Sequence, residues 1–324
     1  MLKADYEEGW SKLAVREVAE GVFLIDAFDM GIPNRTSVYL VRDERSALID
    51  TGAAHSRERL ILGLQETGLE PRDLQFIILT HIHVDHAGGA GWLLELFPDA
   101  RVIVHPRGAP HLAAPADLKA ATRKARMAYP FHPCEFLPIP EEKMEAARDS
   151  RQIPLGRRTL TLLETPGHAS HCICIHDDLT NGIFVGDSLG VKIDHVRDHQ
   201  KYEIFLPAMV PPRFEPQEAL RSADKLAAFQ PKWFYYSHFG ASPETERLLA
   251  KYRNVVERAF ELAESLKKEE ADEAAACTRL YNWLLREVLE IPQEVLGKIT
   301  AEIKLSLELN IHGLVRYIAG KRSA

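Results

Sequence analysis

Short apolar segments rich in β-branched and aromatic residues recur along the chain from residue 22 to residue 237. Gly, Pro, Asp or Asn bounds most of these segments, which is typical of strands separated by turns. The predicted strands cover residues 22–26, 37–41, 47–50, 76–80, 101–105, 160–164, 172–176, 183–186 and 233–237. We therefore expect one or more β-sheets in this part of the chain.

Amphipathic segments between some of these strands predict helices. One helix is predicted to follow Gly52 and to end at Gly68. A second helix starts at Pro216, because proline is favoured in the first turn, and it stops before Pro231. The mixture of strands and helices predicts a layered α/β fold.

The pattern changes near residue 242, because strand-like segments are absent after it and apolar residues follow helical spacing. The sequence therefore predicts two domains, a mixed domain over residues 1–242 and a helical domain over residues 243–324. Three apolar stripes belong to the helical part: Leu248, Tyr252, Val255, Ala259, Leu262 and Leu266; Leu280, Trp283, Leu284 and Val288; Ile303, Leu307, Ile311 and Leu314. These stripes either pack on the first domain or pair two chains as a homodimer.

The composition is that of an ordinary globular protein, with 46% hydrophobic and 27% charged residues among 324. A formal net charge of −7 provides no general basic field for nucleic acid or anionic lipid. No segment approaches the roughly 20 apolar residues that span a bilayer. We therefore expect a cytoplasmic protein that acts on a small molecule and has neither a nucleic acid nor a membrane as its partner.

Four side chains that can bind metals follow the predicted strand at 76–80, in the segment THIHVDH. These residues are His81, His83, Asp85 and His86. Packing three imidazoles and a carboxylate together costs much desolvation free energy unless a shared cation compensates for it. This segment therefore indicates a metal site.

Three more candidate ligands come just after predicted strands. His168 lies in TPGH, Asp187 in GD and His238 in SH. Because the strands of a layered sheet can end at one edge, residues beyond them can converge despite their separation along the chain. We expect these three residues to join the THIHVDH segment in one site.

The motifs TH-x-H-x-DH, TPGH, GD and SH, in this order, resemble the metallo-β-lactamase superfamily over roughly residues 20–242. The resemblance implies an αββα sandwich with a metal site at one end, between the two sheets, and a helical extension after it. It implies two metals with the following ligands: His81, His83 and His168 for one, Asp85, His86 and His238 for the other, and Asp187 as the bridge. Asp50 matches the acidic position that, in this family, supports the metal ligands without binding the metal itself.

Imidazole and carboxylate ligands suit Zn²⁺, and they also accept iron or manganese. Two divalent cations against Asp85 and Asp187 leave about two positive charges, enough to hold a hydroxide between the metals. Because metal binding lowers the pKa of water from 15.7 to roughly 7, this bridging hydroxide is the expected nucleophile. The expected reaction is hydrolysis of an ester, thioester or lactone carbonyl, with Asp85 and Asp187 as the catalytic carboxylates.

The complete first motif and the single bridging Asp187 resemble the glyoxalase II and lactonase branches of the superfamily. The sequence departs from glyoxalase II at the last motif, where SHFG replaces the typical GHE. Two other functions are compatible with the motifs. One is a mononuclear iron enzyme that resembles persulfide dioxygenases, with its metal at His81, His168 and Asp187. The other is a binding protein that keeps its metals for stability.

Two stretches, residues 105–136 and 191–214, are long enough to form loops that border a substrate pocket. Candidate substrate contacts within them are Arg107, Tyr129, Tyr202 and Arg213. Either stretch would determine which substrate reaches the metals.

Other reactive side chains are expected to have supporting roles. His171 follows the TPGH motif, and we expect it to support the site without binding metal. Cys172 and Cys174 alternate along a strand and are expected to be buried, reduced thiols on one face. The segment GDSLG resembles a serine nucleophile elbow, but a metal role for its aspartate is the better interpretation.

Overall fold

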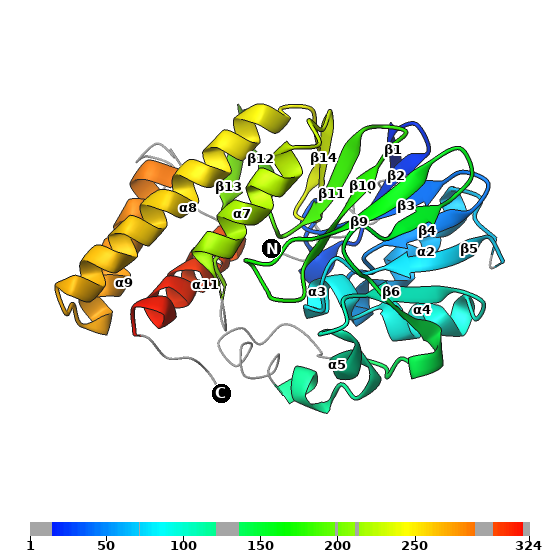
Figure 1. Cartoon of the computed structure of the whole chain (residues 1–324), viewed down its shortest axis with the longest axis horizontal. Coiled ribbons are helices and arrows are strands. Elements are labelled where there is room, and N and C mark those ends of the chain that lie inside the picture. Colours follow the sequence, from blue (N-terminus) through cyan, green and yellow to red (C-terminus); the bar gives the residue numbers. More distant parts are fainter. Residues whose placement is uncertain are drawn as a thin grey trace.

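The computed structural model describes residues 15–70, 72–120, 136–197, 200–210, 214–288 and 301–319. Two β-sheets face each other, and helices cover the outer face of each sheet (Figure 1). Apolar side chains from both sheets form a third core between them. This layer order is the αββα sandwich that the motifs indicate, so the predicted fold class is confirmed.

The first sheet has seven strands, which lie side by side in the order of the sequence. They are β1 (Val15–Ala19), β2 (Val22–Asp26), β3 (Ser37–Arg42), β4 (Ser46–Ile49), β5 (Leu74–Ile78), β6 (Arg101–Val104) and β7 (Met144–Ala146). Strands β1 to β4 pair antiparallel, whereas β4 to β7 pair parallel. Because β4 and β5 are parallel neighbours, the residues that follow them emerge at the same edge of the sheet.

The second sheet has six strands in the order β15, β14, β11, β10, β9, β8. Their bounds are β8 (Gln152–Pro154), β9 (Thr159–Glu164), β10 (Ile173–Asp177), β11 (Gly182–Gly186), β14 (Trp233–Tyr236) and β15 (Gly240–Ser242). Strands β9 and β11 both pair antiparallel with β10, and β14 pairs parallel with β11. Consequently β9, β11 and β14 run in one direction, and their carboxyl ends share one edge.

Alternating side chains place apolar residues on both faces of the second sheet. In β10, Ile173 and Ile175 lie in the core between the sheets, whereas Cys174 lies in the outer core. In β11, Phe184 lies in the inner core and Val185 in the outer one. Strands that are covered on both faces have continuous apolar runs, which explains why they stand out in the sequence.

The helices around the sandwich are mostly short. They are η1 (Asp29–Gly31), η2 (Ala54–Ser56), α2 (Arg57–Glu66), α3 (Val84–Ala87), α4 (Ala90–Leu96), α5 (Ala109–Ala113), η3 (Glu141–Lys143) and α7 (Pro216–Ala227). The helix predicted after Gly52 is confirmed as α2, which buries Leu60 and Leu64 against the first sheet. The helix predicted from Pro216 is confirmed as α7, which covers the second sheet.

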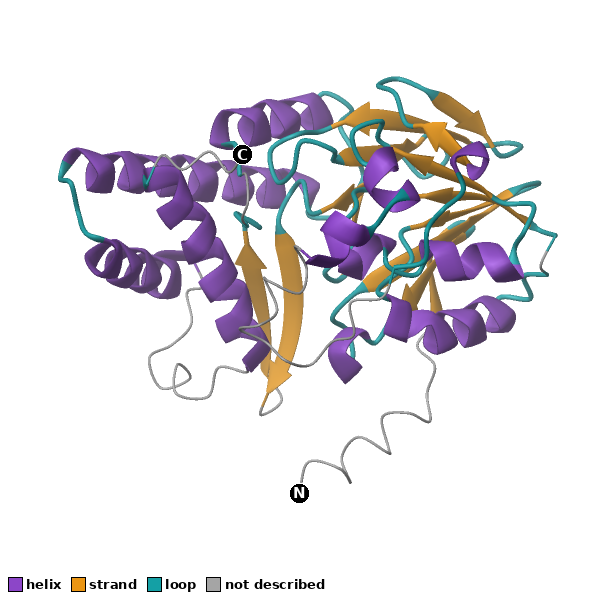
Figure 2. Cartoon of the chain, turned by 90° about the horizontal axis from the view of Figure 1, so that it is seen from below, coloured by secondary structure: helices purple, strands orange, loops and turns teal. Residues whose placement is uncertain are grey.

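Residues 191–197 and 200–206 form the two strands of a β-hairpin, where we expected a loop. Its strands are β12 (Val191–Arg197) and β13 (Gln200–Leu206), with Val191 paired to Leu206 at the base. Figure 2 shows this hairpin as the pair of long strands between the C-terminal helices and the sandwich. The expectation was wrong because it relied on continuous apolar segments, whereas polar and apolar residues alternate in VKID and KYEI, and this period of two is typical of a strand.

Helices follow the sandwich, as the apolar stripes predict. They are α8 (Thr245–Lys268), α9 (Glu273–Trp283), a π-helical segment η4 (Leu284–Val288) and α11 (Ala301–Ile318). Their buried apolar residues form one core with α7, the hairpin and the outer face of the second sheet. The stripes therefore pack within this chain, apart from Ile303, whose side chain lies outside the described residues, while the domain boundary at residue 242 and a homodimer stay predictions. In the described segments, no helix has the length and apolar character needed to cross a membrane.

Arg158 and Asp177 form an ion pair in which both side chains are fully buried. Arg158 Nη1 lies 3.3 Å from Asp177 Oδ2, and its Nη2 donates to the carbonyl of Glu20. Removing one partner leaves an unpaired charge in the interior, which costs about 3–5 kcal/mol. We predict that Arg158→Met lowers the free energy of unfolding by about this amount, as measured by urea denaturation.

The neighbouring residue provides a matched control. Arg157 pairs with Glu20 and Asp43, but its side chain is 63% exposed. Because exposed ion pairs contribute little to stability, Arg157→Met should leave the unfolding midpoint almost unchanged. Equal losses in the two variants would contradict a special contribution from the buried pair.

Candidate metal centre

All seven candidate metal ligands singled out in the sequence lie close together at one end of the sandwich. They form two groups in which the ligand atoms lie within 4.8 Å of one another: His81, His83, His168 and Asp187 in the first group, and Asp85, His86 and His238 in the second. Most of them follow strand ends, namely β5, β9, β11 and β14, whereas Asp85 and His86 lie on the short helix α3. The shared edge of β9, β11 and β14 is what brings distant parts of the chain together here.

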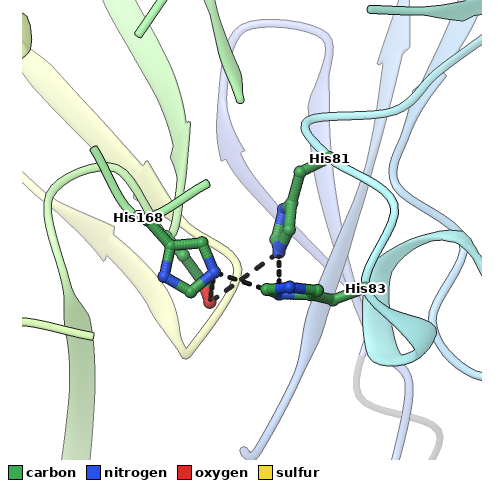
Figure 3. Close-up of side chains that lie close together, drawn as sticks. His81, His83 and His168 are labelled. Atoms are coloured by element: carbon green, nitrogen blue, oxygen red, sulfur yellow. Dashed lines mark hydrogen bonds and ion pairs between the residues drawn. The ribbon is translucent and has the colours of Figure 1, made fainter. Parts of the chain in front are cut away.

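In the first group, three imidazoles turn their ring nitrogens toward one another (Figure 3). His83 Nδ1 lies 2.9 Å from His81 Nε2 and 3.0 Å from His168 Nε2. Asp187 Oδ2 lies 3.4 Å from His168 Nε2 and 4.0 Å from His81 Nε2. The four ligand atoms therefore surround one small space.

In the second group, Asp85 Oδ2 lies 3.3 Å from His238 Nε2 and 3.8 Å from His86 Nε2. The other oxygen of Asp187, Oδ1, lies 3.5 Å from His86 Nε2 and 3.7 Å from His238 Nε2. The carboxylate of Asp187 thus lies between the two groups, with one oxygen facing each.

The two groups fit divalent cations. In the described part of the chain, His86 Nε2 and Asp187 Oδ1 are buried polar atoms without a hydrogen-bond partner. Buried polar atoms are rarely left in this state, because the loss of water is then uncompensated. Two ligand atoms bound tetrahedrally to Zn²⁺ at 2.0–2.1 Å lie roughly 3.4 Å apart, which matches most of the distances above. The unpartnered atoms therefore point to a cation as their partner.

Asp50 connects several of these segments through hydrogen bonds. It is fully buried, and its carboxylate accepts hydrogen bonds from the Thr80 amide at 2.8 Å and from Ser237 Oγ at 3.0 Å. His86 Nδ1 lies 2.8 Å from Asp50 Oδ2. Thr80 Oγ1 also donates to Asp50 and lies 3.1 Å from His81 Nδ1. Asp50 therefore orients His86 directly and His81 through a hydroxyl group.

Backbone carbonyls orient two further imidazoles. His168 Nδ1 lies 2.8 Å from the carbonyl of Ala208, and His238 Nδ1 lies 2.9 Å from that of Arg35. A carbonyl only accepts hydrogen bonds, so each Nδ1 carries the proton and each Nε2 keeps its lone pair toward the site. Neither partner has a sequence signal, because any residue type offers a carbonyl.

Gly186 permits the close approach of Asp187 to the first group. Its φ is +51°, and an added Cβ would lie 2.8 Å from the Cβ of Thr80. Glycine alone avoids both the strained conformation and the clash. The G in the GD motif is thus explained by the contact between β11 and the segment after β5.

The imidazoles of the first group are held neutral. Burial lowers the pKa of both His81 and His83 well below the ordinary value, and neighbouring imidazoles lower these values further. Burial also lowers the pKa of His168, although the carboxylate of Asp187 opposes the change. Neutral imidazole is the form that binds a metal, so this group is ready to act as a ligand set.

Carboxylates dominate the second group. Burial disfavours the charged form of His86, but Asp187, Asp85 and Asp50 outweigh it and raise the pKa of His86 to about 10. Burial favours the neutral form of Asp85, but His86 and His238 lower its pKa well below the ordinary value. The ionised Asp85 carboxylate makes this space attractive to a cation, which must displace the proton of His86.

His171 lies beside the first group without belonging to it. Its ring centroid is 6.2 Å from that of His81 and 6.0 Å from that of His83. Burial lowers the pKa of His171 to about 4, and its Nδ1 is buried without a hydrogen-bond partner in the described part of the chain. His171 thus lies next to the ligand groups, and its supporting role stays a prediction.

The other candidates contribute less to the site. Arg107 donates to the carbonyl of Ser170 at the molecular surface. Tyr129 and Arg213 lie outside the described residues, as does the side chain of Tyr202. Within the GDSLG segment, the serine at position 188 is buried and its hydroxyl lies 3.0 Å from Thr165 Oγ1.

Both cysteines are buried, as expected, although Cys172 lies just before β10 and only Cys174 lies on that strand. Cys172 and Cys174 are buried free thiols, and burial raises the pKa of each. A raised thiol pKa disfavours the thiolate, which is the form that attacks substrates and binds metals. Their role is therefore to pack in the sandwich.

The four-layer sandwich and the two groups of His and Asp side chains define a class of α/β proteins able to bind metal ions. A sequence model of the metallo-beta-lactamase superfamily matches residues 31–238, which contain all seven residues of the site. This chain belongs to the metallo-beta-lactamase superfamily.

Individual relatives are distant. An acyl-coenzyme A thioesterase of Homo sapiens, MBLAC2, is 28% identical over 190 residues, which are 54% of this chain and 65% of that protein. An uncharacterized protein of Methanocaldococcus jannaschii is 30% identical over 117 residues, 33% of this chain and 29% of that protein. The matched segments thus span less than two thirds of both relatives.

Solved structures share the fold. The crystal structure of ST1585 from Sulfolobus tokodaii superposes with a TM-score of 0.66 at 21% identity, over 91% of this chain and 98% of that one. The metallo-beta-lactamase family protein TTHA1429 from Thermus thermophilus gives a TM-score of 0.61 at 20% identity, over 94% and 95% of the two chains. Both superpositions extend beyond the sandwich and cover most of this chain.

The contacts of Asp50 lead to a prediction about metal affinity. Asp50→Asn keeps the shape but replaces one acceptor oxygen with an N–H group, so His86 loses a well-oriented partner or Thr80 does. Loss of such a supporting partner weakens metal binding by roughly 10–100-fold. We expect this loss above all for the Zn²⁺ ion at the second ligand group, which contains His86. Competition with a chromophoric chelator measures it. Unchanged binding of both equivalents would contradict the role of Asp50.

Proposed function

We propose that this protein is a hydrolase that uses two divalent metal ions, with Zn²⁺ as the best match to its ligands. The proposal depends on one observation, the carboxylate of Asp187, which presents one oxygen to each group of imidazoles. A carboxylate in this position can bind two cations at once and set their separation. The other ligands divide between the two ions as follows: His81, His83 and His168 for the first, and Asp85, His86 and His238 for the second.

Two such ions, when bound, polarise a carbonyl oxygen and lower the pKa of water toward roughly 7. The residues of the chain supply positioning. Asp187 is 8% exposed and lies between the two ligand groups, whereas Asp85 is 26% exposed. Solvent and substrate therefore reach Asp85 more readily, and we assign to its carboxylate the orientation of the attacking water or hydroxide, from which it accepts a hydrogen bond.

Thioesters are the first substrate class in this proposal, ahead of lactones and simple esters. Two divalent ions against Asp85 and Asp187 leave about two positive charges, which favour a leaving group that departs as an anion. A thiolate forms more easily than an alkoxide, because a thiol has a pKa near 8.5. The thioesterase name of the human relative supports the same order.

Metal content provides the first test. We expect purified protein to hold about two metal ions per chain by elemental analysis. Removal of these ions with a chelator should abolish hydrolysis of acyl-coenzyme A, lactone and nitrophenyl ester substrates, while the far-UV circular dichroism stays unchanged. Added Zn²⁺ should restore the activity. A folded, metal-free protein that is inert toward the whole panel would contradict the proposal.

Asp187→Ala provides the second test. Because this change removes the one side chain that faces both groups, it should weaken metal retention and lower the rate of hydrolysis by more than about 100-fold. Asp178→Ala is the matched control, since Asp178 accepts a hydrogen bond from the Thr159 amide away from the site. Unchanged turnover in Asp187→Ala would refute the bridge.

One iron per chain with thiol-dependent oxygen consumption would favour the mononuclear alternative.

A further inference from the structure

The base of the β12–β13 hairpin is attached to three of the seven site residues. The amide of Gly190 donates to the carbonyl of Asp187 at 3.0 Å. The amide of Lys192 donates to the carbonyl of His238, and the amide of Phe239 donates back to Lys192. At the same base, the segment after β13 carries the Ala208 carbonyl, which contacts His168. The hairpin therefore borders both ligand groups through its backbone.

The contact with His168 depends on an unusual backbone conformation. Ala208 has a φ of +52°, in the left-handed region that residues other than glycine rarely adopt. This conformation directs its carbonyl to His168 Nδ1 at 2.8 Å, where it also accepts from the Val210 amide at 3.0 Å. A non-glycine residue in this region persists only where the surroundings hold it in place.

Helix α11 provides that restraint. Asn310 is 2% exposed, and its Oδ1 accepts a hydrogen bond from the Met209 amide at 2.8 Å. The Asn310 Nδ2 donates to the Ser306 carbonyl one turn earlier at 2.8 Å, which fixes the orientation of the amide. Gly313 lies on the same face of the helix, three residues later, and an added Cβ there would lie 2.1 Å from the Met209 carbonyl oxygen. The helix thus touches both polar groups of the residue next to Ala208.

We propose that Asn310 and Gly313 are positioning residues of the metal centre, which set the Ala208 carbonyl and through it the orientation of His168. The inference depends on the proposed metal site, but not on the substrate. It gives the C-terminal helices a second role beside covering the sheet, because their packing determines how well the first ligand group binds its ion. Partners of metal-ligating histidines determine tautomer and ring orientation, and their loss typically costs roughly 10–100-fold in affinity.

The test compares Asn310→Ala with Leu307→Ala. Leu307 lies on the same helix, is fully buried in the shared apolar core and makes no hydrogen bond through its side chain. Both variants loosen the packing of α11, but only Asn310→Ala removes the acceptor for the Met209 amide. We expect Asn310→Ala to lower the affinity of the first ligand group for Zn²⁺ by about 10-fold, near the lower end of the range for such partners. Leu307→Ala should leave it unchanged at a temperature where both variants are folded.

Two readouts separate positioning from stability. One is competition between the protein and a chromophoric chelator for Zn²⁺, together with the visible spectrum of the Co²⁺-loaded protein. The other is the ¹⁵N chemical shift of His168 in the metal-free protein, which reports its tautomer. Asn310→Ala should change both readouts, whereas Leu307→Ala should change neither. Gly313→Ala should also lower the affinity of the first ligand group for Zn²⁺, because the added methyl group displaces the Met209 carbonyl.

Three outcomes would overturn the proposal. One is an affinity in Asn310→Ala equal to that of the wild type. Another is an equal loss in Leu307→Ala, which would mean that affinity follows stability alone. The third is a wild-type chain that binds no divalent cation, which would refute the metal centre as well. If the wild type binds Zn²⁺ and Asn310→Ala weakens this binding, but no substrate is hydrolysed, only the proposed function is refuted.

Discussion

The site depends on one electrostatic constraint, the burial of imidazoles and carboxylates within a few ångströms of one another. Burial keeps the imidazoles of the first group neutral, and the carboxylates around His86 hold it charged. Asp187 lies between the two groups with one oxygen toward each, and one of these oxygens has no hydrogen-bond partner among the described residues. Cations satisfy such an arrangement better than any protein group, because a divalent ion accepts several lone pairs at once.

Two kinds of support hold the ligands in place, and they come from opposite sides of the sandwich. Asp50, at the end of β4, anchors His86 and reaches His81 through Thr80. On the other side, the carbonyl that orients His168 is held by the hairpin and by α11. The first ligand group is therefore sensitive to the packing of the last helix, although about 140 residues separate His168 from Asn310 along the chain.

The elements that are apolar on both faces are easily recognised in the sequence, whereas the amphipathic hairpin has a weaker signal, the alternation of polar and apolar residues. Strands such as β10 and β11 are covered on both sides, so their apolar runs are continuous and easily seen. In β12 and β13, charged residues alternate with apolar ones, and the runs are interrupted. The short strands β7 and β8 were also missed, because three residues carry too little pattern to separate a strand from a loop.

The sequence by itself determined which side chains form the candidate site, because imidazoles and carboxylates just past strand ends are chemically distinctive and locally spaced. It also determined the layered architecture, through the period of the apolar positions. Only the tertiary structure decided how each imidazole is oriented, since the partners include the carbonyls of Arg35 and Ala208. Every residue offers an identical carbonyl, so its role depends on where the chain folds and leaves no trace in residue type.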